Sequence, residues 1–86
     1  AKAAVLEAQA ALKLAPNSLH AQYVLGAAYK KDRLYDEAIA AFNKVLAVDP
    51  KDPYTNIQIG QIYSSKQQYP QAAEVFRRAM EARFSR

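Results

Sequence analysis

The feature that most constrains this chain is a spacing of 34 residues at which similar side chains recur. The only two glycines, Gly26 and Gly60, are separated by that spacing. The same offset relates five further pairs of similar type: Leu25 and Ile59, Tyr29 and Tyr63, Tyr35 and Tyr69, Ala38 and Ala72, and Phe42 and Phe76. It also relates the start of the chain to its middle, through the pair Ala4 and Ala38 and the pair Pro16 and Pro50. Internal periods of roughly 20–50 residues are typical of repeat architectures, so we predict stacked structural units.

Local patterns predict that each unit is helical. Apolar residues recur at helical spacing, as in Ala38, Phe42 and Val45, and prolines and polar pairs interrupt these stretches. We expect helices over residues 2–14 and 19–31, and three more that begin near Asp36, at Pro53 and at Pro70. Asn17 and Ser18 are expected to supply cap oxygens to the second helix, and Asp52 is expected to cap the fourth. Helices of this length are marginal alone, so they must pack, and the fold class is all-α with five antiparallel helices.

The sequence resembles the tetratricopeptide repeat family. The residues that carry the resemblance are Leu25-Gly26-x2-Tyr29, Ala38-x3-Phe42 and Pro50, followed by Ile59-Gly60-x2-Tyr63 and Ala72-x3-Phe76. The resemblance implies helix-turn-helix repeats stacked as a right-handed superhelix of about two and a half units. Residues 1–18 would be the second helix of a preceding repeat, 19–52 one unit, and 53–86 a unit without its closing proline. We expect one continuous domain that is a piece of a longer array.

The sequence departs from the family pattern at two kinds of position. Gln22 and Asn56 replace the leading aromatic residue, and Arg33 and Gln67 replace the frequent turn glycine. The family geometry implies that each glycine faces the alanine of the next helix, so that Gly26 would lie opposite Ala38 and two backbones could approach closely.

Composition excludes most chemical functions. The chain has no cysteine and one histidine, His20, which has no nucleophile at a recognisable spacing, so we predict no enzyme, no metal site and no cofactor. No uninterrupted apolar run is long enough to cross a bilayer, and no targeting signal that would assign a compartment is visible. The net charge of +4 falls well short of the concentrated basic stripe that is expected of a nucleic-acid binder. A weak alternative is binding of nucleic acid or an acidic surface by Arg77, Arg78, Arg83 and Arg86.

The remaining function is protein–protein interaction. The resemblance implies a concave groove formed by the first helices of successive repeats, which would bind a protein or peptide through His20, Tyr23, Ala27, Lys30, Tyr54, Ile57, Gln58, Gln61 and Ser64. The alternative is that these are ordinary surface residues of a spacer repeat, which does not itself bind the partner. A second hypothesis is a homo-oligomer that assembles through an uncovered end helix, with Val75, Phe76, Met80 and Phe84 as its contact residues.

Overall fold

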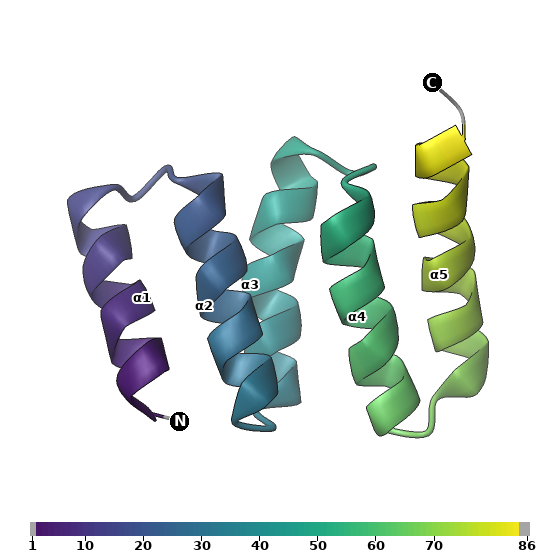
Figure 1. Cartoon of the computed structure of the whole chain (residues 1–86), viewed down its shortest axis with the longest axis horizontal. Helices are drawn as coiled ribbons and strands as arrows, with labels where there is room; N and C mark the ends of the chain where they lie inside the picture. The colour runs from purple at the N-terminus through teal and green to yellow at the C-terminus, as the bar shows by residue number, and fades with distance from the viewer. Residues whose placement is uncertain (1, 85–86) are drawn as a thin grey trace.

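The protein is a stack of helices without a sheet over the part that the computed structural model describes, which is residues 2–84 for the backbone and residues 3–82 for the side chains. These residues form helices α1 (Lys2–Leu14), α2 (Leu19–Lys31), α3 (Tyr35–Val48), α4 (Pro53–Ser65) and α5 (Tyr69–Phe84). Figure 1 shows them following one another from the N-terminus to the C-terminus. The prediction of an all-α fold with five helices is therefore confirmed.

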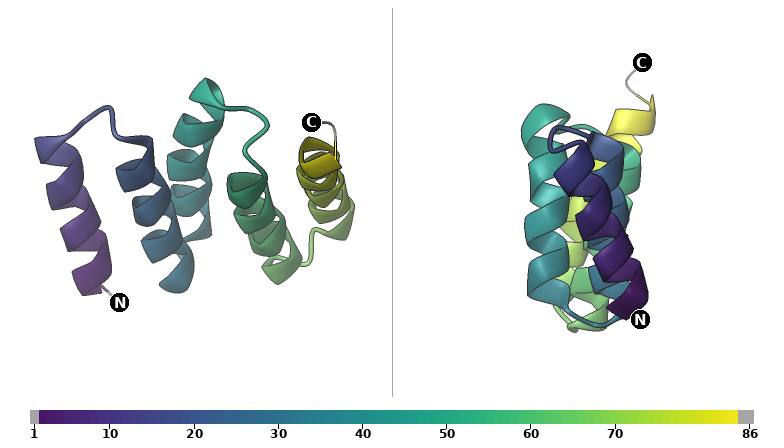
Figure 2. Two further views of the ribbon diagram at one scale, coloured as in Figure 1. Left: turned by 45° about the horizontal axis from the view of Figure 1, so that its top comes forward. Right: turned by 90° about the vertical axis from the view of Figure 1, so that its left-hand side faces the viewer.

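The helices form a shallow array in which each one packs against the next, and α2 also contacts α4. In Figure 1, α3 lies behind α2, and the two views of Figure 2 show the same succession from other sides. The array measures 34 × 30 × 14 Å, so it is thin in one direction. Helices α2 and α4 therefore lie beside each other on one face, where both can contact the same ligand.

The core lies between the two helical hairpins. Its main cluster contains Ala38, Phe42, Ile59, Ile62 and Val75, with Tyr29, Tyr35 and Tyr63 packed around it. The Phe42 and Ile62 side chains are fully buried, and each such side chain stabilises the fold by about 1.5–3 kcal/mol. Val75 is also buried, so the prediction that it belongs to an uncovered contact face is wrong. Its place in the register is that of Ala41, which is buried too.

Each glycine makes room for an aromatic ring of the following helix. A Cβ atom on Gly26 would lie 2.6 Å from Phe42 Cε1, and one on Gly60 would lie 2.6 Å from Phe76 Cε1. We expected each glycine to face an alanine, and this is wrong. The atoms nearest to each glycine belong to the phenylalanine ring, in both repeats. The close approach itself is present and has the same geometry in both repeats.

The turn inside each hairpin adopts a left-handed conformation without glycine. Arg33 has φ 63° and Gln67 has φ 61°. The backbone N–H of Leu34 donates to Tyr29 O at 2.9 Å, and that of Gln68 donates to Tyr63 O at 2.8 Å. These six-residue hydrogen bonds define a Schellman motif, whose left-handed residue is usually glycine. The two side chains therefore occupy positions that disfavour any Cβ atom.

The other end of each hairpin is held by polar side chains. Ser18 caps α2 as predicted, because its Oγ accepts a hydrogen bond from the Ala21 N–H at 3.1 Å. Asp52 makes no such bond to the α4 backbone, so that part of the prediction is wrong. Its carboxylate accepts a hydrogen bond from the Thr55 hydroxyl instead, at 2.5 Å. The buried Asn56 side chain donates to the carbonyls of Pro50 and Asp52, which ties the preceding loop to α4.

A candidate peptide-binding groove

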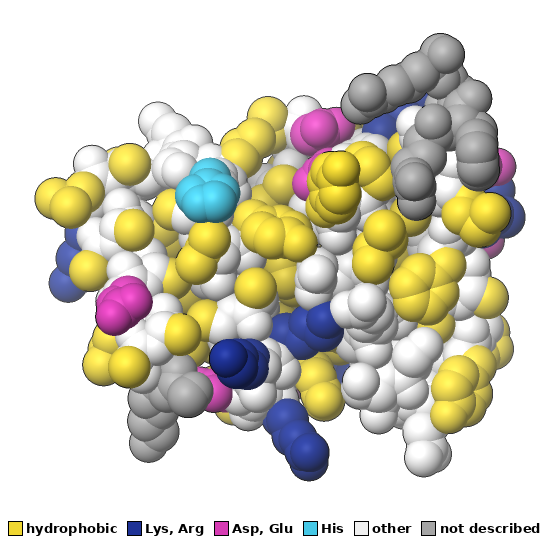
Figure 3. Space-filling view, viewed as in Figure 1, with side chains coloured by type: hydrophobic (Ala, Val, Ile, Leu, Met, Phe, Trp, Pro, Cys, Tyr) yellow, Lys and Arg dark blue, Asp and Glu magenta, His cyan; other side chains and the backbone are white. Residues whose placement is uncertain are grey.

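The surface between α2 and α4 contains a pocket near the first turns of both helices. We name it the groove pocket; its volume is 450 Å³, and it is lined by Leu19, His20, Tyr23, Val45, Asp49, Asp52 and Tyr54. In Figure 3, apolar side chains surround the cyan histidine on this face. The structure therefore brings together three of the predicted groove residues, His20, Tyr23 and Tyr54.

The two tyrosines of the groove pocket differ in how firmly they are held. Tyr23 is half-buried, and its ring centroid lies 5.6 Å from that of Phe42 in a tilted arrangement. Such aromatic pairs are favourable and fix the ring orientation. Tyr54 is 69% exposed at the start of α4. One wall of the pocket is therefore rigid, and the other offers a large aromatic surface that a ligand can cover.

Two carboxylates give the groove pocket a negative rim. Asp49 follows α3 and Asp52 precedes α4, so the short loop between these helices carries both acids to the pocket. The Thr55 hydroxyl occupies one lone pair of Asp52, but a carboxylate can accept several hydrogen bonds. The pocket thus combines aromatic surface with acceptors suited to a cationic side chain, although the chain as a whole carries a net charge of +4.

Further along the groove, a lysine connects α2 with α4. Lys30 Nζ donates to Gln58 Oε1 at 2.7 Å and also to Gln61 Oε1. Partial burial lowers the pKa of Lys30 below its ordinary value because it removes water from the ammonium group. This lysine–amide cluster contains three of the predicted groove residues, so the structure brings them into direct contact.

The other three predicted groove residues are less prominent. Ala27 packs against the main core cluster from α2. Ile57 and Ser64 are half-buried on α4 and line neither the groove pocket nor the lysine–amide cluster.

The residues of the two alternative hypotheses lie on the last helix and at its end, and the structure describes the side chains of only some of them. Phe76 is half-buried against Gly60, whereas Met80 is 59% exposed. The side chains of Phe84, Arg83 and Arg86 lie outside the described residues. Arg77 Nη1 contacts Glu81 at 2.7 Å, and Arg77 also pairs with Glu74.

Charge pairing along α5 offsets its arginines. Glu74 accepts hydrogen bonds from Arg77, and this contact lowers the pKa of Glu74 and raises that of Arg77. Arg78 Nε lies 3.6 Å from the same carboxylate. A phosphate group would have to compete with these acids, so the described part of α5 is not a free cationic face.

The described residues contain neither a cluster that could bind a metal ion nor a helix that could cross a membrane. Within residues 2–84, His, Asp and Glu side chains do not gather in groups of three that could hold a metal ion. None of the helices in that range is long and apolar enough to cross a membrane.

Sequence reasoning missed Leu19, Val45, Asp49 and Asp52 as groove pocket residues. It took the two aspartates only as residues that end or begin a helix, and Val45 only as part of the core stripe. The available signal was their place in the sequence, because the loop between α3 and α4 must return the chain to the face on which α2 and α4 both lie. Side chains in such a loop can reach that face.

Comparisons with known proteins agree with this geometry. The tetratricopeptide repeat family matches residues 21–52 and again residues 57–86. Sixteen chains of solved structures match, and one is the crystal structure of MamA, with a TM-score of 0.85 and 29% identity. The match covers 95% of this chain and 48% of the MamA chain, so the chain spans about half the length of that protein. No curated protein sequence matches.

The matched family describes helical repeats that generally mediate protein–protein interaction and are typically not enzymes. Its two matches begin near the starts of α2 and α4, and each includes the glycine and the phenylalanine that pack together in one hairpin. The structure is accordingly a helical repeat superhelix. The chain belongs to the tetratricopeptide repeat family.

Proposed function

We propose that this chain binds a segment of a partner protein along the groove between α2 and α4, with a lysine or arginine side chain of that segment in the groove pocket. The observation that carries the proposal is the pocket itself, because it combines 450 Å³ of space with two tyrosines and two aspartates. Aromatic surfaces and carboxylates together favour a cation that also has an apolar stem.

The groove pocket suits an arginine or lysine in shape as well as charge. The stem of the incoming side chain would lie against Tyr54, which is exposed in the free chain and would lose contact with water on binding. Its charged end would reach Asp49 or Asp52 at the rim. Charged hydrogen bonds of this kind are stronger than those between neutral groups.

The lysine–amide cluster would orient the rest of the bound segment. Lys30 has three N–H donors, and the contacts to Gln58 and Gln61 use two of them. The third can donate to a carbonyl or carboxylate of the ligand. Because Gln58 and Gln61 hold the ammonium group in place, little side-chain entropy is lost when the ligand binds.

The experiment is a selection of random dodecapeptides displayed on phage against the 86-residue chain, followed by affinity measurements on the enriched peptides. We expect enriched peptides to share a lysine or arginine next to an apolar residue. Tyr54→Ala should weaken their binding by about tenfold, since aromatic anchors commonly contribute 1–2 kcal/mol or more. Asp49→Asn should weaken binding, and the loss should shrink at high salt.

Tyr69→Ala is the matched control for Tyr54→Ala. Tyr69 is 61% exposed at the start of α5 and does not line the groove pocket, so its loss should leave the affinity unchanged. Equal losses for Tyr54→Ala and Tyr69→Ala would refute the proposed site. Enriched peptides without a cationic residue, insensitive to Asp49→Asn, would refute the role of the acidic rim.

A further inference from the structure

The lysine–amide cluster of Lys30, Gln58 and Gln61 directs hydrogen-bond donors away from its centre. Lys30 Nζ donates to Gln58 Oε1 at 2.7 Å and also to Gln61 Oε1. Because an ammonium group can only donate, these contacts hold each amide with its oxygen toward the lysine and its NH2 group away from it. Within the described side chains, residues 3–82, neither NH2 group makes a hydrogen bond. The cluster therefore combines a positive charge with unused N–H donors on all three side chains.

A carboxylate fits such a set of donors. An ionised carboxylate only accepts hydrogen bonds, and its two oxygens offer about four sites for donors. Hydrogen bonds with an ionised partner are roughly twice as strong as neutral ones. Partial burial also lowers the pKa of Lys30, because it removes water from the ammonium group, and a bound carboxylate would replace that lost solvation. The ligand group that matches the cluster is therefore an acid.

The cluster lies two helical turns away from the groove pocket on both helices. Tyr23 of the pocket and Lys30 are seven residues apart on α2. Tyr54 of the pocket and Gln61 are seven residues apart on α4. Seven residues of an α-helix span about 10 Å. Figure 1 shows α2 and α4 running in the same direction, so the pocket lies near the start of both helices and the cluster lies toward their ends.

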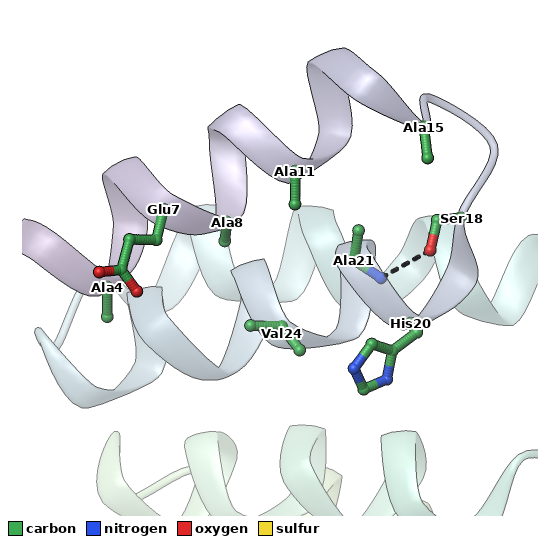
Figure 4. Close-up of a pocket in the computed structure, with 9 residues that line it drawn as sticks. All are labelled: Ala4, Glu7, Ala8, Ala11, Ala15, Ser18, His20, Ala21 and Val24. Carbon is green, nitrogen blue, oxygen red and sulfur yellow. Dashed lines mark hydrogen bonds between the residues drawn. The ribbon is translucent and has the colours of Figure 1, made fainter.

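The two sites carry opposite charges. Asp49 and Asp52 form the rim of the groove pocket, whereas Lys30 supplies the charge of the cluster. His20 also lines the pocket, and Figure 4 shows its ring directed away from α1. In Figure 3, acidic side chains lie near the upper edge of this face and basic ones lie near its centre. A segment that matches both sites therefore carries a cation at one place and an acid at the other.

We infer that the lysine–amide cluster binds the carboxylate of an Asp or Glu side chain, and that this acid lies three residues from the Lys or Arg that enters the groove pocket. The inference rests on the proposed function and adds the class of partner segment, which carries two opposite charges at a fixed spacing. In a polyproline II conformation, residues three apart point the same way and are separated by about 9 Å, which matches the distance along the groove.

A side chain fits the cluster better than the carboxylate at the end of a partner chain. Helices α2 and α4 contact each other, and the half-buried Lys30 side chain connects them. A flexible side chain can reach Nζ while the backbone of the segment stays at the surface. A chain end would have to bring its backbone into the narrow space between the two helices.

The test compares acetylated and amidated octapeptides that differ at one position. Each contains leucine and lysine, followed three residues after the lysine by glutamate or by glutamine. We expect the glutamate peptide to bind the chain about tenfold more tightly in calorimetric titrations, because only glutamate supplies a charged acceptor. A peptide with glutamate directly after lysine should bind no better than the glutamine peptide. Each peptide is made in both chain directions, and the direction that binds more tightly is used for the variants.

Three variants of the chain assign the preference for glutamate to the cluster. Lys30→Met removes the charge and keeps the apolar stem, and Gln61→Glu keeps an oxygen for Lys30 but replaces the outward NH2 group. Both should abolish the preference. Lys31→Met is the matched control, because Lys31 is the exposed neighbour on α2 and takes no part in the cluster. This control should preserve the preference.

Two further readouts separate this inference from the proposed function. Tyr54→Ala should weaken the glutamate and glutamine peptides by the same factor, since it alters only the groove pocket. In the isotopically labelled chain, the side-chain NH2 signals of Gln58 and Gln61 should move with the glutamate peptide, and also with a peptide that contains glutamate and no lysine. Movement of these signals without any effect of Tyr54→Ala would support the carboxylate site and refute the groove pocket.

Equal affinity of the glutamate and glutamine peptides would overturn the inference, and so would a preference that survives Lys30→Met or Gln61→Glu. An equal loss of preference with Lys31→Met would show a general effect of net charge. Equal affinity of the peptide with glutamate next to lysine would refute the spacing. A peptide whose only carboxylate is a free C-terminus, if it bound as tightly, would make a chain end the occupant.

Discussion

Substituting Gly26 by alanine should destabilise the chain, although alanine is the better helix former. The new Cβ atom would lie 2.6 Å, 2.7 Å and 2.9 Å from three atoms of the Phe42 ring. That ring is fully buried, so it has no open direction in which to move. Overpacking of this kind costs about 1–3 kcal/mol, while alanine in a helix interior returns about 1 kcal/mol. We therefore expect a net loss of up to about 2 kcal/mol.

The corresponding change in the next repeat provides an internal comparison. Gly60→Ala creates the same contact with Phe76, but Phe76 is only half-buried and its ring can shift toward solvent. Its net cost should therefore be smaller than that of Gly26→Ala. Urea unfolding followed by circular dichroism measures both differences in the free energy of unfolding.

A double substitution tests whether the ring is the cause. Phe42→Leu removes the atoms nearest to the new methyl group, so Gly26→Ala should cost less in that background, with a coupling energy of about 0.5–3 kcal/mol. A Gly26→Ala chain more stable than the original would refute the reasoning, because it would show that helix propensity outweighs the collision.

Three further substitutions test the turns and the loop before α4. Arg33→Gly and Gln67→Gly should each raise the free energy of unfolding by about 0.5–1 kcal/mol, because glycine tolerates the positive φ of these positions and only part of that gain is lost to the entropy of the unfolded chain. Thermal unfolding measures this gain. A lower unfolding midpoint for both variants would contradict the assigned backbone. Asn56→Ala should lower the free energy of unfolding by about 1–3 kcal/mol, because it removes two hydrogen bonds made by a residue that is only 2% exposed. An unchanged midpoint of urea unfolding would show that these hydrogen bonds do not stabilise the loop.

The sequence predicted the fold well because its strongest signal is periodic. The spacing between Gly26 and Gly60 defines the repeat, and the prolines and Ser18 define where helices end and begin. Prolines and capping residues act on the backbone of the residues next to them, so their effect does not depend on how the helices pack. The sequence did not reveal which atoms fill the space above each glycine, because that depends on how two helices cross.

The candidate site was only partly predictable for a similar reason. Helical spacing placed Tyr23 and Lys30 on one face of α2 without showing what they contact. The hydrogen bonds from Lys30 to two glutamines of α4 depend on the distance between helices in adjacent repeats. The Asp52 carboxylate accepts a hydrogen bond from the Thr55 hydroxyl and none from the α4 backbone. This outcome depends on which side-chain rotamer Asp52 adopts, and the sequence does not reveal it.

The register error at Val75 has a definite cause. Apolar residues occur on more than one side of α5, so periodicity alone does not show which of them faces the core. The structure places Val75 in the main cluster and leaves Met80 exposed. Tracing Val75 back by one repeat to Ala41 would have required the burial of Ala41 to be known first.

The most direct test of the whole account is an NMR measurement of nuclear Overhauser effects from the glycine Hα protons. Equivalent packing of the two hairpins requires one Hα of Gly26 to contact the ring of Phe42 and one Hα of Gly60 to contact the ring of Phe76. We expect strong cross-peaks for both pairs, together with ring-current shifts of both glycines. A cross-peak for one pair without the other would mean that residues 34 apart do not occupy equivalent places, and the repeat-based account of the groove would fail with it.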